Sequence, residues 1–432
     1  MKRSFKITSA VLAVCCLAPL FSGCASNSAQ NSSSKAPNQK VTLTIYTQYS
    51  ADDEKQPYDY AVAEMKKEMP NVDLKLEIMA QDDNQKLKTY AATNNLPDIF
   101  NATTDIIESF KKSNNILKLD SYVKKFGISD KLLPSAQSLL KDSSEHTYAV
   151  PDAGQFAALI YYNKEVLKKC GVEVPTDYEG FLSAVKKIKA KGFVPLALFG
   201  KEKWPGVQLF DMLASRENPN GIKDLNDGKA KASDKAYVDA ANKMTELIHN
   251  GLLPADVFNV SSDDAEAMFK SGKAAMYISG AWALSDLGSS MGDKVGYMYC
   301  PLASKENADT VQWNLSGGGY NSGLGVNPRS KNVDIAAEYC CKFALAFAKG
   351  RVIKRGDPNP ILKETVNPEK PYTAIQKQYV EDSSKFKTMT CFDWGLTNST
   401  FKAGIEDETS KLLTGKYPVS QFTQSVQGSI NQ

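Results

Sequence analysis

The sequence predicts an α/β fold with two lobes, on the basis of three observations. Strands and helices alternate over residues 41–100, the alternation begins again over residues 157–250, and breaks rich in glycine or proline follow at 317–319 and 357–360. Alternating strands and helices are typical of a parallel sheet covered by helices. Two separate runs favour two lobes, and the breaks mark candidate crossings between them.

The first run opens with a strand and continues as a regular alternation. Residues 41–46 (VTLTIY) alternate and are β-branched, which predicts a strand. We expect a helix over 57–69 that ends before Pro70, because its apolar residues share one face. A strand over 72–79, a helix over 85–93 and a short buried strand over 96–100 complete the run.

The second run repeats the alternation. Residues 157–163 form an apolar stretch that predicts a strand, and 178–191 carry apolar residues at helical spacing. We then expect a strand over 194–199, a helix over 234–250 closed by Gly251, and a strand over 275–279.

Composition limits the number of domains and argues against a nucleic-acid partner. The chain has 432 residues, 42% of them hydrophobic, which suits two domains or one large one. Residues 1–23 hold three of the 52 Lys and Arg residues and no Asp or Glu, so the rest of the chain, with 49 of each sign, is neutral. This balance gives no basis for a nucleic-acid partner.

The N-terminus indicates export. Lys2, Arg3 and Lys6 precede an apolar run from Ile7 to Phe21 that is too short to span a bilayer. Small residues and then Cys24 resemble a bacterial lipoprotein signal, which implies a lipid on Cys24, although Phe21 stands where that signal usually has leucine. Residues 24–40 are rich in Ser, Asn and Gln and predict a flexible linker.

The cysteines and histidines do not form a metal-binding pattern. Five of the eight cysteines lie beyond Cys24, at spacings unlike those of zinc sites, and the chain has two histidines. Cys340 and Cys341 lie in an apolar helical stretch and are expected in the core. We expect no metal and no cofactor, and the pairing of Cys170, Cys300, Cys340, Cys341 and Cys391 stays open.

Several motifs together resemble the extracellular solute-binding proteins of ATP-driven importers, in the carbohydrate-binding family that includes the maltose-binding protein. The motifs are Leu96-Pro97-Asp98-Ile99, the segment 162–167 (YNKEVL) with 174–181 (VPTDYEGF), and 268–282 (MFKSGKAAMYISGAW). The last is the most specific, and Tyr178 stands where the family usually has tryptophan.

The resemblance implies a periplasmic-binding-protein-like type II fold with a three-strand hinge. We expect a signal peptide over 1–23, an N-terminal lobe from 41–153 and 320–358, and a C-terminal lobe from 157–316 and 361–432. It also implies no enzymatic activity, a carbohydrate ligand, an ABC transporter permease as partner and a monomer. The lipoprotein signal independently implies a location outside the cytoplasmic membrane with a lipid anchor.

Aromatic and planar polar side chains are the expected ligand contacts, because sugars present C–H faces and hydroxyls. By resemblance Trp282, at a strand end after Gly280, is the first candidate, followed by Trp204 and Trp394; core packing is the alternative for each. The polar candidates lie near strand ends or at positions that contact ligand in the family: Gln48, Asn101, Asp105, Asp152, Gln155, Asn314 and Asp393.

Two other classes of protein stay open. A secreted glycoside hydrolase needs two carboxylates flanking the scissile bond, and no motif singles out such a pair. A static adhesion lipoprotein would not require glycines near the predicted crossings. Within the preferred class, the sequence does not separate a sugar from a polyol or a glycerol phosphodiester.

Overall fold

The computed structural model describes residues 40–431 except 51, 81, 83, 138, 139, 143, 155, 299, 300, 318–322, 359 and 391. Its strands are β1 (Val41–Thr47), β2 (Val72–Ile78), β3 (Ile99–Ala102), β4 (Ala149–Val150), β5 (Ala158–Asn163), β6 (Val194–Ala197), β7 (Ala274–Gly280), β8 (Val295–Met298), β9 (Asn314–Ser316), β10 (Gly323–Val326) and β11 (Thr388–Thr390).

The α-helices are α1 (Asp52–Glu68), α2 (Gln85–Ala92), α3 (Thr104–Lys112), α4 (Asp120–Lys125), α5 (Ile128–Lys131), α6 (Pro134–Gln137), α7 (Lys164–Cys170), α8 (Tyr178–Ala190), α9 (Trp204–Ala214), α10 (Lys223–Asn226), α11 (Lys235–His249), α12 (Ser262–Lys270), α13 (Leu284–Met291), α14 (Ala308–Val311), α15 (Val333–Gly350), α16 (Ala374–Ser383), α17 (Ser399–Leu413) and α18 (Val419–Ile430). Short turns of 3-10 helix lie at η1 (Val257–Asn259), η2 (Ala281–Ala283) and η3 (Gly292–Lys294), and a π-helical turn, η4 (Arg351–Arg355), continues α15.

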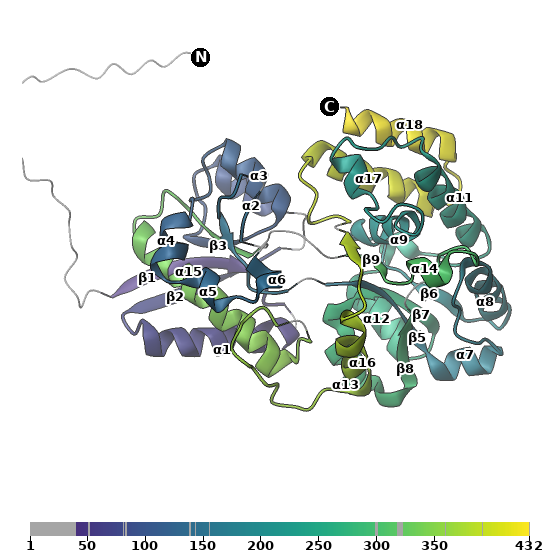
Figure 1. Cartoon of the computed structure of the whole chain (residues 1–432), viewed down its shortest axis with the longest axis horizontal. Coiled ribbons are helices and arrows are strands. Elements are labelled where there is room, and N and C mark those ends of the chain that lie inside the picture. Colours follow the sequence, from purple (N-terminus) through teal and green to yellow (C-terminus); the bar gives the residue numbers. More distant parts are fainter. Residues whose placement is uncertain are drawn as a thin grey trace, which may run out of the picture. The chain divides into compact units, whose positions relative to one another are not determined.

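The first lobe is built on a five-stranded sheet in the order β2-β1-β3-β10-β4. Side chains of β1 alternate between its two faces, as the strand period requires. Leu43 and Ile45 pack in a core with α1 and α15, whereas Tyr46 packs in a second core with α2 and α3. The helices on either face can be followed in Figure 1.

The second lobe is built on a four-stranded sheet in the order β6-β7-β5-β8. Ile160 and Ile278 pack in a core that includes α8, α9, α11, α17 and α18, while Tyr161 and Tyr277 pack in a core with α12, α13 and α16. A separate parallel ribbon pairs β9 with β11, with Ser316 opposite Thr390. The fold is therefore α/β with two lobes, as the sequence predicts.

One strand in each sheet is antiparallel to its neighbours, whereas the sequence predicted parallel sheets. In the first sheet β10 is antiparallel to β3 and β4, and in the second β5 is antiparallel to β7 and β8. Parallel neighbours need a long crossover, usually a helix. β4 ends at Val150 and β5 begins at Ala158, while β9 ends at Ser316 and β10 begins at Gly323, so both connections are too short for such a crossover.

Two predicted limits differ from the structure. Helix α1 begins at Asp52 and runs through Pro57, which the prediction took as its start. The second is the boundary at residue 361, where the C-terminal lobe was predicted to resume. Ile361 and Leu362, expected in the C-terminal lobe, pack in the core of the first lobe, and Leu362 forms a β-bridge with Leu132. The other domain limits stay a prediction.

Candidate functional site

Three tryptophans that the sequence singled out lie in contact with one another. The ring centroids of Trp204 and Trp394 are 5.0 Å apart, those of Trp282 and Trp394 5.7 Å, and those of Trp204 and Trp282 6.0 Å. Their planes are inclined by 58 to 69°. Each indole is half-buried, so the group, called here the tryptophan cluster, keeps surface open to solvent.

Each tryptophan comes from a segment that follows a strand. Trp282 lies in η2 directly after β7, Trp204 begins α9 after β6, and Trp394 follows β11. Strand ends are where open α/β sheets place ligand sites, because loops there leave the sheet in different directions. The sequence predicted this placement for Trp282.

Gly280 allows the indole of Trp282 to lie close to the backbone. A Cβ on Gly280 would be 2.1 to 2.5 Å from three ring atoms of Trp282, far inside van der Waals contact. The buried Tyr161 hydroxyl donates to the Gly280 carbonyl over 2.7 Å. The backbone that carries Trp282 is therefore held in place.

The residue before Trp204 adopts a strained conformation. Lys203 has φ +50° and ψ −48°, and the Trp204 N–H donates to the Glu202 carbonyl two residues back. This is a γ-turn with positive φ, which is rare for a residue with a side chain. Burial raises the pKa of the neighbouring Glu202 carboxyl, against hydrogen bonds from the backbone N–H groups of Ser262 and Glu202 itself. Backbone strain of this kind is concentrated at functional sites.

Three phenylalanines that the sequence did not single out extend the tryptophan cluster. Phe392 lies 5.3 Å from Trp394, Phe199 lies 5.0 Å from Trp204, and Phe156 lies 5.8 Å from Trp282. Phe156 precedes β5, so the segment between the lobes also reaches this site. Phe156 and Phe199 adjoin predicted strands, which was the available signal for them, whereas no strand was predicted near Phe392.

Two predicted polar contacts are buried and paired within the protein. Asp393 is 1% exposed and lies 3.5 Å from the ammonium of Lys402, which also bonds Glu406. Asp152 is 4% exposed, and its carboxylate lies 3.6 Å from the guanidinium of Arg351. Both carboxylates therefore lie next to cations of this chain and are almost entirely removed from solvent.

The candidates on the first lobe lie near the ends of β1 and β3. Gln48 follows β1 and Asn101 lies in β3, and both are half-buried. Asp105 is buried in the first turn of α3, where it accepts from the Thr103 hydroxyl. The N–H of Thr104 donates to the Trp394 carbonyl over 3.3 Å, which links this end of the first lobe with the tryptophan cluster.

Two candidates, Gln155 and Asn314, remain, together with the fourth tryptophan, Trp313, and the lipidation candidate Cys24. Asn314 is buried in β9, and its carbonyl accepts from the Arg216 guanidinium. Trp313 lies against Phe386, 6.2 Å between centroids, rather than in the tryptophan cluster. Gln155 and Cys24 lie outside the described residues.

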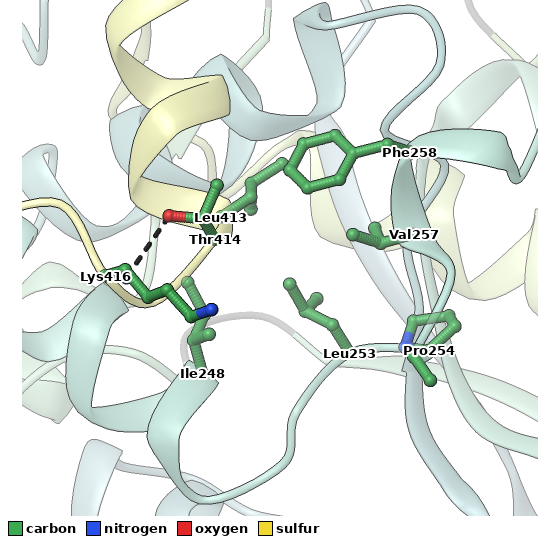
Figure 2. Close-up of a pocket in the computed structure, with 9 residues that line it drawn as sticks. Ile248, Leu253, Pro254, Val257, Phe258, Leu413, Thr414 and Lys416 are labelled. Carbon is green, nitrogen blue, oxygen red and sulfur yellow. Dashed lines mark hydrogen bonds between the residues drawn. The ribbon is translucent and has the colours of Figure 1, made fainter.

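A cavity of about 470 Å³ lies elsewhere in the second lobe, away from the tryptophan cluster. Figure 2 shows its walls, which come from the end of α11, from residues 253–258 and from the end of α17. Phe258 and Lys416 lie on opposite sides of it, and the lining is mostly aliphatic. It lacks a group of aromatic rings in mutual contact such as the tryptophan cluster, which is therefore the better candidate site.

Three further features of the described residues concern the cysteines, metal ligands and membrane-spanning helices. Cys170, Cys340 and Cys341 are buried free thiols, and the last two lie in the core of the first lobe as predicted. Within the ranges given above, no three metal-ligating side chains are grouped to hold an ion. No helix in this part of the chain has both the length and the apolar character needed to cross a membrane.

Relatives with curated names include binding proteins of importers. The chain is 25% identical over 433 residues to an uncharacterised ABC transporter extracellular-binding protein of Pyrococcus horikoshii, covering 96% of this chain and 94% of the relative. It is 28% identical over 188 residues to the melibiose/raffinose/stachyose-binding protein MelE of Bacillus subtilis, covering 42% of each. It is 25% identical to a multiple sugar-binding protein of Streptococcus mutans, over 64% of this chain and 63% of that one.

Solved structures share the fold. A structure from work on xylan utilisation by Caldanaerobius polysaccharolyticus aligns with a TM-score of 0.79 at 24% identity, covering 90% of this chain and 99% of that one. A chitin oligosaccharide binding protein aligns with a TM-score of 0.78 at 22% identity, covering 91% and 98%. The sequence profile of the bacterial extracellular solute-binding proteins matches residues 51–349, more than half of the chain. The protein therefore belongs to the family of bacterial extracellular solute-binding proteins.

Proposed function

We propose that this protein captures a carbohydrate outside the cell and delivers it to the permease of an ABC transporter. The observation that carries the proposal is the tryptophan cluster, in which Trp204, Trp282 and Trp394 meet at strand ends of a solute-binding fold. Named relatives in Bacillus subtilis and Streptococcus mutans are sugar-binding proteins, which supports the same ligand class.

The mutual contact of the three indoles limits how a sugar binds. Centroid separations of 5.0 to 6.0 Å are direct ring contacts, so no sugar ring fits between the rings as they stand. A sugar instead stacks its C–H face on the open surface of the cluster. Planar polar groups then satisfy its hydroxyls, with Gln155, Asn101 and Gln48 as the proposed donors and acceptors.

Closure of the two lobes around the ligand is the proposed mechanism. The described ends of the connections into β5 and β10 lie close to other backbone: a Cβ on Gly317, just after β9, would lie 2.5 Å from the Ala158 nitrogen at the start of β5, and one on Gly323, at the start of β10, would lie 2.0 Å from the Val150 carbonyl oxygen at the end of β4. We propose these segments as two hinge strands. A ligand shifts the population toward the closed form only if it binds that form more tightly, which contacts from both lobes provide.

The place of action follows from the N-terminal signal. We propose cleavage before Cys24, a lipid on its thiol and a monomeric protein held outside the cytoplasmic membrane by residues 24–40. In this scheme the protein catalyses no reaction, and the transporter alone hydrolyses ATP.

Calorimetry with a panel of mono- and oligosaccharides tests the proposal. Trp282→Ala is expected to weaken binding at least tenfold, about 1.4 kcal/mol, because it removes a stacking surface. Trp313→Phe is the matched control, since Trp313 lies outside the cluster. Equal affinity of wild type and Trp282→Ala would remove the cluster from the site, and new reducing ends during incubation would favour a hydrolase.

A further inference from the structure

Helix α9 carries two fully buried polar side chains on the face that begins with Trp204. Gln208 lies one turn after Trp204 and Asp211 lies about two turns after it, and both are 0% exposed. Residues four and seven positions apart share one face of a helix. Because a buried polar group is costly unless it is hydrogen-bonded, the partners of these two residues show what they hold in place.

Gln208 holds the end of β7. Its side-chain Nε2 donates to the Ser279 carbonyl over 2.5 Å, and Ser279 lies three residues before Trp282. The next carbonyl, of Gly280, accepts from Tyr161. The backbone that presents Trp282 is thus fixed to α9 on one side and to β5 on the other.

Asp211 holds the β9–β11 ribbon. One carboxylate oxygen accepts the Ile222 N–H over 2.8 Å. The other accepts the hydroxyls of Ser316 in β9 and of Thr390 in β11, the latter over 2.9 Å. Thr390 lies four residues before Trp394, and its carbonyl accepts the N–H of Gly317 over 2.7 Å.

These hydrogen bonds and burial have opposite effects on the pKa of Asp211. Burial raises the pKa of Asp211, while the bonds from Ser316, Ile222 and Thr390 and the nearby Arg216 act in the opposite direction. The partners of this carboxyl are a backbone N–H and two hydroxyls, so an asparagine can satisfy them as well: its amide oxygen accepts the N–H and its NH₂ donates to the two hydroxyl oxygens.

We propose that Gln208 and Asp211 are positioning residues, which align the segments of Trp282 and Trp394 on the helix that begins with Trp204. One helix face then sets the geometry of all three indoles. The two side chains are fully buried, so they act through the tryptophans rather than by touching the ligand. The consequence for affinity rests on the proposed carbohydrate binding; the consequence for indole geometry does not.

The test combines near-UV circular dichroism with calorimetry, in a Trp313→Phe background that leaves only the three clustered tryptophans. Gln208→Leu and Asp211→Ala are expected to reduce the near-UV tryptophan signal by at least half, and to weaken sugar binding at least fivefold. Asp211→Asn is expected to keep both, because its amide oxygen accepts from Ile222 while its NH₂ donates to the two hydroxyls, which are free to reorient. Measurements are made where far-UV spectra show fully folded protein.

Met244→Ala is the matched control, since Met244 is equally buried in the same core but lies on α11. It is expected to lower stability while leaving the near-UV signal unchanged. If Asp211→Ala does not fold, Thr390→Val removes one of its partners at nearly constant volume. The proposal is overturned if these variants keep the wild-type signal, if Met244→Ala loses as much, or if Asp211→Asn behaves like Asp211→Ala. A wild type that binds no sugar would overturn the proposed function alone.

Discussion

The position of Trp282 depends on the absence of a side chain at Gly280. The φ of Gly280 is −140°, an extended value open to any residue, so the requirement is steric rather than conformational. Gly280→Ala is expected to displace the indole, because the new methyl would lie 2.1 Å from a ring carbon. Calorimetry should show at least a tenfold loss of carbohydrate affinity, although every tryptophan is retained.

Gly428→Ala is the control for this prediction. Gly428 is exposed in α18, and a Cβ added there would have nothing within 4 Å of it. Alanine there should leave affinity unchanged and stabilise the helix by up to about 1 kcal/mol. An unchanged affinity in Gly280→Ala would mean that the indole of Trp282 can move without loss to the site.

Single residues of the candidate site were partly predictable. Trp204 and Trp282 follow predicted strands, whereas no strand was predicted before Trp394, so the contact among the three indoles was only partly predictable. Gln208 and Asp211 were not, because a polar residue in a helical stretch ordinarily indicates a solvent-facing position. The burial of Asp393 was also missed, since its partner Lys402 lies nine residues further along, on a different element.

At the scale of elements, Asp98, which precedes β3, joins β1 and the turn before α15. Its carboxylate accepts from the Thr44 N–H over 2.7 Å, from the Thr44 hydroxyl over 2.9 Å and from the Ser330 hydroxyl over 2.5 Å. Asp98 thus links β1 to the turn before α15 across the start of β3. Asp98→Ala is expected to lower the free energy of unfolding by about 2–3 kcal/mol.

Urea unfolding measures this loss, with Asp407→Ala as the control. Asp407 pairs with Lys203 at the surface, both side chains being more than half exposed, so its loss should cost at most about 0.5 kcal/mol. Equal effects of the two substitutions would contradict the linking role of Asp98.

Asp142 stabilises the loop before β4 in a pH-dependent way. Burial alone would raise its pKa, but the Lys111 ammonium and the N–H groups of His146 and Ser144 outweigh burial, and the pKa is lowered. A carboxyl with a lowered folded-state pKa contributes stability above its unfolded pKa of about 3.9, and this is lost as the pH falls through the folded value.

Asp142→Asn is therefore expected to be less stable than wild type at pH 7, with a difference that shrinks as the pH falls below about 4. Denaturant unfolding at a series of pH values follows this difference. A difference that stays constant down to about pH 2 would exclude the ionised carboxylate as its source.

The type of most elements followed from the sequence, whereas their pairing did not. Apolar periodicity located β1, β2, β5, β7 and the helices α8 and α11 within a few residues. The antiparallel directions of β5 and β10 depend on where the chain crosses from one sheet to the other, and no local sequence pattern specifies that crossing. The packing of Ile361 against the first lobe was missed because it too depends on where the chain crosses.

At the scale of the molecule, ligand binding and the state of the two lobes are expected to be coupled. A ligand that binds only the folded protein stabilises it by about 2.7 kcal/mol at a concentration of about 100 Kd. Saturating sugar should therefore raise the melting temperature, and small-angle scattering should show a smaller radius of gyration if the lobes close. A raised melting temperature without compaction would indicate binding by a rigid site.

The segments between the lobes supply the last prediction. Gly317 has φ +109°, which disfavours any side chain, and an added Cβ would also lie 2.5 Å from the Ala158 nitrogen. Gly192 has φ +83°, and a Cβ added there would have nothing within 4 Å of it, so alanine at this position measures the cost of positive φ alone. Gly192→Ala should cost about 1 kcal/mol of unfolding free energy, and Gly317→Ala about 2–3 kcal/mol, because the second segment must also move away. If these segments are hinge strands, Gly317→Ala alone should also reduce the sugar-induced compaction. Equal costs for the two variants, with full compaction in both, would show that the contact at Gly317 constrains neither stability nor closure.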